Sequence, residues 1–247
     1  MLEPEPVLTR IGLIVPSSNR LTEPQMRQYA PKGIEVHVTR LRMTGPHHVP
    51  VAALLPRIEE ATGALEDAHC DVIVFNCTAS SMEAGLRGEE QVLATMRAAT
   101  RATVATTATA TLAALGALGV RRVALFSPYV QETHAHEAAF LTEAGIEVTG
   151  GECLGLNGGD EYLLVQPSEW QQLVLKATPE SADGVFLSCT NIHAPPVIEP
   201  LESALRRPVA SSNQAVLWHA LRACGNAAPV VGLGRLFEVD REPAVAR

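Results

Sequence analysis

One short motif occurs twice in the chain, 112 positions apart, and this repeat restricts the possible folds. The tetrapeptide GIEV stands at 33–36 and again at 145–148. Other residues match across the same spacing: Ile11 with Val123, Asp71 with Asp183, Cys77 with Cys189, and Thr78 with Thr190. After the cysteines the spacing shortens to 105, where Val104-Ala105 matches Val209-Ala210. A period above 100 residues is the size of a domain, so the repeat predicts a duplicated unit and not a solenoid.

Within each unit, predicted strands and helices alternate. Short apolar, β-branched runs predict strands at 11–15, 34–38, 71–76, 103–105, 122–127, 146–149, 184–188 and 208–210. Longer stretches rich in Ala, Leu and Glu predict helices, among them 51–68, 107–118, 131–144 and 212–223. We therefore predict an α/β fold of two similar Rossmann-like halves, each with a parallel four-stranded sheet. A pseudo-two-fold axis would relate the halves, with the active site between them.

The repeat also indicates where the halves divide. We expect an N-terminal half over 1–117 and a C-terminal half over 118–225. The tail, 226–247, is expected to cross back and pack on one of them. A chain of 247 residues is long enough for two such units.

Composition excludes several classes of partner. The net charge is −8 and no basic run occurs, which disfavours nucleic acid and anionic membranes as partners. No apolar run reaches the roughly 18 residues of a transmembrane helix, and the acidic, proline-bearing start is unlike a signal peptide. We expect a cytoplasmic protein whose five widely spaced cysteines are reduced thiols.

Uncharged polar residues follow nearly every predicted strand. Parallel sheets bind ligands at the carboxyl ends of their strands, so these residues are candidates for a site. They include Ser17, Asn19, Thr78, Tyr129, Thr190 and Asn191, with Ser211, Ser212 and Asn213 after the last strand. Ser, Thr and Asn also cap helices, and capping is the structural alternative for each of them.

Two cysteines share this strand-end position. A pseudo-two-fold axis would bring Cys77 and Cys189 to one cavity from opposite sides. We expect each to lie near a helix N-terminus, where backbone N–H groups lower a thiol pKa from ~8.5 toward neutrality. The same donors bind a carboxylate, so we predict a small carboxylic acid as the substrate. Cys70, Cys153 and Cys224 lack this context and are interpreted as structural.

No metal or cofactor motif is evident in the sequence. His134 and His136 are two positions apart on a predicted helix and point to different faces, and His47-His48 has no partner motif. Neither lysine, Lys32 or Lys176, stands at a strand end where a pyridoxal Schiff base would form. Dinucleotide and P-loop glycine motifs are also absent, so we predict a cofactor-independent protein.

Several segments resemble a known superfamily. The sequences IGLIVPSSN, FNCTASS, FSPY and LSCTN resemble the aspartate/glutamate racemase superfamily, in particular its maleate cis-trans isomerase and arylmalonate decarboxylase branch, over roughly 10–238. The resemblance implies a cofactor-free enzyme with its active site between two α/β halves. It also implies that Cys77 is the nucleophilic or proton-accepting cysteine of the first half and that Cys189 is its counterpart.

The resemblance implies roles for the neighbouring residues too. Asn19 and Tyr129 resemble residues that hold a substrate carboxylate, and Thr78, Thr190 and Asn191 resemble flanking donors. Arylmalonate decarboxylases are similar but have glycine at the first cysteine, so both cysteines together favour an isomerase or racemase. Maleate isomerases carry an Asn in a "DN" context after the sixth strand, for which Asn157 is the nearest candidate. The segment LRMTGP (41–46) is similar to relatives linked to ectoine breakdown.

Four functions are compatible with these residues. The leading hypothesis is cis-trans isomerisation of a short unsaturated diacid such as maleate, by addition of the Cys77 thiolate to the double bond with Cys189 in proton transfer. In a racemase or epimerase, the two cysteines would act as a base and an acid on opposite faces of one carbon. The third possibility is a decarboxylase similar to the arylmalonate enzymes. The fourth is a two-lobed binding protein for small acids that catalyses no reaction. By analogy with relatives, we expect a homo-oligomer, either a dimer or a tetramer.

Overall fold

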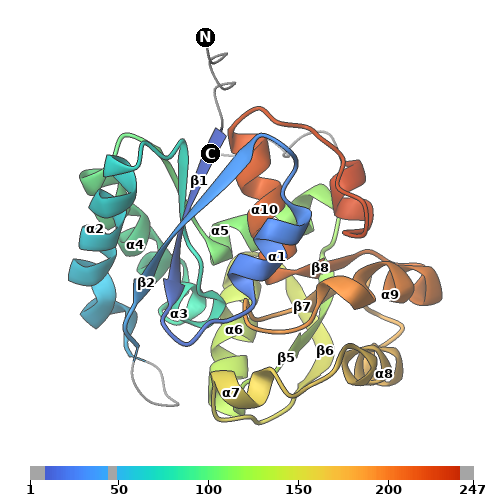
Figure 1. The fold of residues 1–247 in the computed structure, drawn as a ribbon. Helices are drawn as coiled ribbons and strands as arrows, with labels where there is room; N and C mark the ends of the chain where they lie inside the picture. The colour runs from blue at the N-terminus through green and yellow to red at the C-terminus, as the bar shows by residue number, and fades with distance from the viewer. Residues whose placement is uncertain (1–8, 44–48, 240–247) are drawn as a thin grey trace.

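The computed structural model describes residues 9–43 and 49–239 (Figure 1). Its strands form two parallel four-stranded sheets with the orders β2-β1-β3-β4 and β6-β5-β7-β8. The first sheet contains β1 (Thr9–Pro16), β2 (Ile34–Leu41), β3 (Val72–Phe75) and β4 (Thr103–Thr106). The second contains β5 (Arg122–Ser127), β6 (Glu147–Cys153), β7 (Gly184–Leu187) and β8 (Val209–Ser211). The predicted α/β fold with two sheets of the same kind is therefore confirmed. Part of the LRMTGP segment and the pair His47-His48 lie outside the described residues.

The two sheets share their register as well as their strand order. Ile11 pairs with Val72 in the first sheet, and Val123 pairs with Gly184 in the second, each 112 positions later. Ile73 pairs with Val104 in the first sheet, and Val185 pairs with Val209 in the second. Here the first residues of the two pairs are 112 positions apart and the second residues are 105 positions apart. The sequence repeat therefore corresponds to equivalent positions in space.

The edge strand β6 departs from this symmetry. Its register against β5 shifts between Val123 and Ala124, where a bulge inserts one residue. Gly151 follows, with a φ of 118°, and a Cβ there would lie 1.9 Å from the Leu125 carbonyl oxygen. Only glycine fits so close an approach of two backbones.

Helices connect the strands and cover the sheets. In the first half these are α1 (Thr22–Tyr29), α2 (Val51–Asp67), α3 (Thr78–Met82), α4 (Gly85–Ala99) and α5 (Thr107–Ala117). In the second half they are α6 (Gln131–Glu143), α7 (Gly159–Tyr162), α8 (Pro167–Ala177), α9 (Ile198–Leu205) and α10 (Ser212–Ala223), with short 3-10 turns η1 (Pro195–Val197) and η2 (Arg235–Glu238). The four helices predicted by range agree within one residue at each end. Within the described ranges, none of the helices has the length and apolar character required to cross a bilayer.

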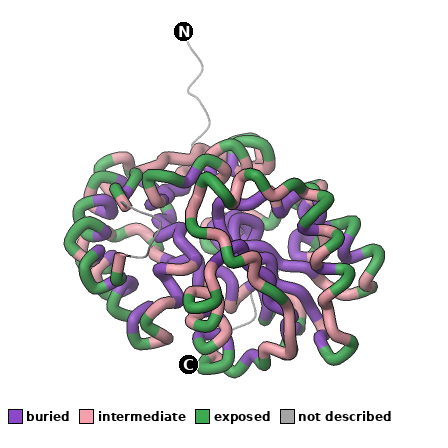
Figure 2. The backbone as a smooth tube through the Cα atoms, turned by 90° about the horizontal axis from the view of Figure 1, so that it is seen from below, coloured by how far each residue is buried: buried purple, intermediate pink, exposed green. Residues whose placement is uncertain are grey.

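The halves meet along α5 and α10, which pack against each other between the two sheets (Figure 1). Capping fixes where these helices begin: Thr106 Oγ1 accepts the Thr109 N–H, and the Ser211 N–H donates to Gln214 Oε1 at the matching place in the second half. The capping alternative therefore holds for the Thr106 side chain, whereas Ser211 is the N-cap residue of α10 without a cap hydrogen bond from its own hydroxyl. Buried residues gather in the interior of the molecule, and exposed residues lie around its periphery (Figure 2).

The described part of the tail, 226–239, packs on both halves. Leu236 and Phe237 are buried in the cluster that contains α10, and the Arg222 guanidinium lies over the Phe237 ring. Gly232 comes close to the Tyr29 ring of α1. The tail therefore contacts the second half through α10 and the first half through α1.

Candidate active site

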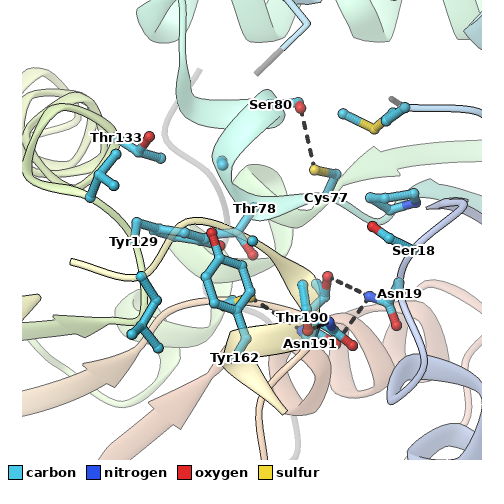
Figure 3. Close-up of a pocket in the computed structure, with 18 of the residues that line it drawn as sticks. Ser18, Asn19, Cys77, Thr78, Ser80, Tyr129, Thr133, Tyr162, Thr190 and Asn191 are labelled. Atoms are coloured by element: carbon cyan, nitrogen blue, oxygen red, sulfur yellow. Dashed lines mark hydrogen bonds between the residues drawn. The ribbon is translucent and has the colours of Figure 1, made fainter. Parts of the chain in front are cut away.

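A cavity of about 400 Å³ lies between the halves, at the carboxyl ends of the strands (Figure 3). Residues of both halves line it, including Ser18, Asn19, Met43, Cys77, Thr78, Ala79, Ser80, Tyr129, Glu132, Thr133, His136, Leu156, Tyr162, Cys189, Thr190 and Asn191. No lysine or arginine is found among its described lining residues. An anionic ligand would therefore be held by hydroxyl and amide donors, as the sequence predicts.

Cys77 is positioned by the end of β3 and the start of α3. It is the N-cap residue of that helix, with an ordinary extended backbone at φ −144°. Its Sγ lies 3.3 Å from Ser80 Oγ, in a hydrogen bond visible in Figure 3. The helix has only five residues, so its dipole adds little beyond the local donors. The predicted position at a helix N-terminus is confirmed for Cys77.

Cys189 has a different backbone setting at the end of β7. Its φ is 119°, a left-handed conformation that non-glycine residues rarely adopt. Its N–H donates to Ser212 Oγ at 3.0 Å, and the Asn191 N–H donates to its Sγ at 3.3 Å. A turn follows, with the next helical residues beginning only at Pro195. Cys189 therefore does not cap a helix of its own, and the helix N-terminus near it is that of α10, which it contacts through Ser212.

Burial decides the proton affinity of both thiols. It raises the pKa of Cys77, and hydrogen bonds from Ser80 only partly oppose that effect. Burial also raises the pKa of Cys189 to about 12, against hydrogen bonds from Tyr129 and from the Asn191 N–H. The expected fall toward neutrality is wrong for the resting site, because removal of the thiolate from water outweighs the nearby donors.

One hydroxyl connects the two cysteine loops across the halves. Thr78 Oγ1, next to Cys77, donates to Ser212 Oγ at 2.9 Å, and that oxygen accepts the Cys189 N–H. All four residues are buried. A buried polar chain of this kind fixes the relative position of the groups it joins. Ser212 therefore holds the two thiol-bearing segments in one arrangement.

The predicted donors on the other side of the cavity already bond to one another. Asn19 Nδ2 donates to Thr190 Oγ1 at 2.9 Å (Figure 3). Asn19 Oδ1 accepts the Thr22 N–H. Asn191 Nδ2 donates to the Gly159 carbonyl, and its Oδ1 accepts the Arg20 N–H. These amides shape the cavity wall, so a ligand would share or displace their bonds.

Two predicted substrate-binding residues are not part of the cavity lining. Ser17 Oγ instead accepts the Met43 N–H at 3.2 Å. Asn157 is exposed, and its N–H donates to Glu161 Oε2. The "DN" comparison therefore does not lead to a residue that faces the thiols here.

The sequence did not single out three residues that lie in the site or beside it. Tyr162 comes from the short helix α7 and packs edge-on against Tyr129, with ring centroids 5.6 Å apart. Ser80 forms a hydrogen bond with Cys77. Its position three residues after the cysteine, in the first turn of a helix, could have indicated this contact. Glu137 is fully buried on α6, within four residues of the buried Phe140 and Leu141. An acid on the apolar face of a helix could have been noticed in the sequence.

The histidines do not form a metal site in the described part of the chain. No group of three or more His, Cys, Asp or Glu side chains there has the arrangement to hold a metal ion. His134 Nδ1 lies 2.8 Å from Ser127 Oγ, whereas His136 lines the cavity. The two rings thus point in different directions, as their spacing predicts.

The chain is similar to two kinds of characterised protein. The family model described as arylmalonate decarboxylase matches residues 11–237. Arylmalonate decarboxylase of Bordetella bronchiseptica is 33% identical over 190 residues, which cover 75% of this chain and 79% of that protein. Maleate isomerase of Geobacillus stearothermophilus is 28% identical over 245 residues, covering 92% and 96%.

Solved structures of both kinds superpose well. A liganded arylmalonate decarboxylase, with a glycine-to-cysteine and a cysteine-to-serine substitution, has a TM-score of 0.86 at 30% identity, covering 93% of this chain and 99% of that one. A Nocardia farcinica maleate cis-trans isomerase, in a cysteine-to-serine mutant with a covalently bound succinylcysteine intermediate, has a TM-score of 0.85 at 26% identity, covering 93% and 98%.

Proposed function

The chain belongs to the arylmalonate decarboxylase family, whose relatives include decarboxylases and maleate isomerases, and on that premise we propose that it is a cofactor-independent isomerase of a small unsaturated diacid such as maleate. One observation carries the proposal: Cys77 and Cys189 stand at matched strand ends, 112 positions apart, and line one cavity. A single thiol would be enough for a decarboxylase of the kind the sequence resembles. Two thiols fit a reaction that needs both a nucleophile and a proton carrier.

The proposed reaction begins with Cys77 as a thiolate, after its proton has passed to solvent. Its sulfur forms a bond to one alkene carbon, and the π electrons move to the neighbouring carbon, which takes the proton of the Cys189 thiol. The adduct can now rotate about a single bond. The Cys189 thiolate takes the proton back, the carbon–sulfur bond breaks, and the trans diacid leaves with Cys77 a thiolate again.

The surroundings of the two sulfurs support this division of roles. The Cys77 thiol donates to Ser80 Oγ at 3.3 Å, and once the sulfur is ionised the Ser80 hydroxyl and backbone N–H can donate to it and stabilise the thiolate. Burial raises the pKa of Cys189 to about 12, so that residue keeps its proton until an acceptor carbon is available. A covalent succinylcysteine intermediate in the Nocardia farcinica enzyme is consistent with a cysteine nucleophile in this family.

Neutral donors around the cavity would bind the two carboxylates of such a substrate. The Tyr129, Tyr162 and Ser18 hydroxyls belong to the lining. The first N–H groups of α3 have no partner within the helix and are further donors. Together they can also stabilise the enediolate-like charge that develops during addition, as an oxyanion hole does.

The proposal is tested with the purified protein and maleate, with fumarate measured by proton NMR. We expect turnover by the wild type and none by Cys77→Ala. Cys153→Ser is the matched control, because Cys153 bonds to Gln131 and lies outside the cavity lining. Turnover by Cys77→Ala at the wild-type rate would rule out thiolate addition by Cys77.

The placement of the two thiols at opposite halves of one cavity also favours a second candidate, a racemase or epimerase. In that reaction one thiolate removes a proton from a carbon, and the other thiol returns a proton on the opposite face. Acidic amino acids incubated in deuterium oxide would distinguish it. Deuterium at Cα without maleate turnover would favour the racemase.

A further inference from the structure

Glu137 is a fully buried acid that the proposed reaction does not use. It stands on α6 and has none of its surface exposed. Neither of its carboxyl oxygens has a hydrogen-bond partner of normal geometry among the described residues. A buried carboxylate without partners is costly, whereas the protonated acid is tolerated much better. The surroundings therefore favour the neutral form of Glu137.

The position of Glu137 connects it to both thiols. Its helix packs against α3, which Cys77 caps, and its carboxyl faces the Ser188 hydroxyl next to Cys189. A negative charge on Glu137 acts on Cys77, on Cys189, and on the phenols of Tyr129 and Tyr162. Each of these four groups gains proton affinity when Glu137 is ionised.

The groups that face Glu137 supply no compensating positive charge. From the segments around α3, β7, the end of β5 and α7 they are two thiols, one hydroxyl and two phenols. Helix α4 and strand β6 also pack against α6. The α4 arginines, Arg87 and Arg97, are exposed, and the titratable groups of β6 are two exposed acids and a thiol. From the end of α3, Glu83 adds a second negative influence on Cys77. On its own helix, His134 is bonded to Ser127 and His136 lines the cavity. Ionisation of Glu137 therefore adds a negative charge beside groups that must themselves become negative.

We propose that Glu137 is a positioning residue that sets the charge state of the thiol pair: as a neutral acid it lets one thiol ionise, and once ionised it keeps both protonated. The inference rests on the proposed function only in taking Cys77 and Cys189 as the reacting groups. It concerns one proton that Glu137 exchanges with solvent, with no other bond made or broken.

The pH range of this effect follows from the environment of the carboxyl. Burial raises the pKa of Glu137 to about 8, with the Ser188 hydroxyl opposing the shift. Below that pH Glu137 is neutral and has no Coulomb effect on the thiols. Above it the negative charge suppresses thiolate formation, so thiol reactivity rises with pH less steeply than it would without this residue.

The test measures thiol reactivity and needs no substrate. Iodoacetamide labelling of Cys77 and Cys189 is followed by peptide mass spectrometry from pH 6 to pH 10 in the wild type and in Glu137→Gln. We expect equal rates at pH 6 and, above pH 8.5, about tenfold faster labelling in the variant, equivalent to one pKa unit. Glu89→Gln is the matched control: Glu89 is buried on α4, bonded to the Thr106 and Thr109 hydroxyls, and should leave the labelling profile unchanged.

Identical labelling profiles in the wild type and Glu137→Gln would overturn the inference. If Glu137→Gln does not fold, Glu137→Met, which fills a similar volume without charge, is measured in the same way and must show the same acceleration. The outcome is independent of the substrate. If Glu137→Gln changes the labelling profile but the wild type does not turn over maleate, the role of Glu137 is supported and the proposed isomerase activity is wrong.

Discussion

Cys77 and Cys189 are equivalent by sequence register and by strand position, yet their surroundings differ. Cys77 has an extended backbone, caps α3 and bonds to Ser80. Cys189 has a φ of 119°, precedes a turn and receives the Asn191 N–H on its sulfur. The repeat thus has a thiol at the same point of each sheet, and the segment that follows gives each thiol its own environment: helix α3 after Cys77 and a turn after Cys189.

This difference suggests why two copies of one motif can carry out two chemical roles. Burial raises the pKa of both thiols, to about 12 at Cys189, and at Cys77 the hydroxyl and backbone N–H of Ser80 partly oppose it. The left-handed backbone at Cys189 costs about 1–3 kcal/mol and persists only where the surroundings hold it. The bond from its N–H to Ser212 supplies part of that restraint.

The largest expected effect separates the two cysteines in turnover. Cys77→Ser should abolish isomerisation because a serine hydroxyl at position 77 cannot form the carbon–sulfur bond. Cys189→Ser should lower kcat by about 10²–10⁴-fold, the usual contribution of a proton-transfer group. Steady-state kinetics on maleate measures both. Equal residual rates in the two variants would mean that the thiols have interchangeable roles.

The next effect concerns stability and depends on pH. The pKa of Glu137 is about 8 when folded, above its unfolded value of 4.5, so the folded state holds a proton that the unfolded state loses. The contribution of this retained proton to the free energy of unfolding is complete below pH 4.5 and is lost as the pH rises to 8. Relative to wild type, Glu137→Gln should therefore gain unfolding free energy from pH 5 to pH 8.5, on the order of 4 kcal/mol at most. Urea denaturation at both pH values measures it, and parallel pH profiles would contradict it.

A matched pair of hydroxyls tests the connection between the halves. Ser212 bridges Thr78 and the Cys189 N–H, whereas Thr107, its equivalent at the spacing of 105, bonds within the first half to Asn76 Oδ1. Ser212→Ala and Thr107→Ala should each cost about 1–3 kcal/mol of unfolding free energy. Only Ser212→Ala should also lower kcat. A similar loss of kcat in both variants would show that the bridge has no special role.

The smallest effect should be similar in the two halves, although Asp183 also accepts the Arg121 N–H and pairs with the Arg122 guanidinium. Asp71 Oδ2 accepts the Arg10 N–H at 2.8 Å, and Asp183 Oδ1 accepts the Arg122 N–H at 2.9 Å, at the starts of β1 and β5. Asp71→Asn and Asp183→Asn should each reduce stability by about 0.5–1.5 kcal/mol with turnover unchanged. Thermal unfolding checks this, and a difference above that range between the variants would break the equivalence.

Most of the fold could be predicted from the sequence because the repeat and the apolar runs indicate strands at the same positions. Eight β-branched runs became eight strands, and the spacings of 112 and 105 reappeared as strand register. The bulge in β6 was not predicted, because it depends on the close approach of Gly151 to the Leu125 carbonyl. Such an approach is a tertiary contact without a periodic signal.

The site was predicted in its main residues and not in its proton affinities. Seven of the nine residues assigned a catalytic or substrate-binding role line the cavity, and Ser17 and Asn157 do not. The strand-end candidates Ser211, Ser212 and Asn213 are not part of the lining either. Burial of the thiols, and with it their raised pKa, arises from the packing of two halves that are far apart in sequence. Tyr162 enters from α7, a four-residue helix whose position depends on contacts such as that from Asn191 to Gly159.

The division of roles between the two cysteines is tested most directly by mass spectrometry of Cys189→Ser after incubation with maleate. We predict a mass increase of one maleic acid, mapped to Cys77: the Cys77 thiolate still adds to the double bond and solvent protonates the neighbouring carbon, while the base that would remove that proton for elimination is missing. Cys77→Ser should gain no such mass under the same conditions. An adduct on Cys189 in Cys77→Ser, with none on Cys77 in Cys189→Ser, would contradict the account.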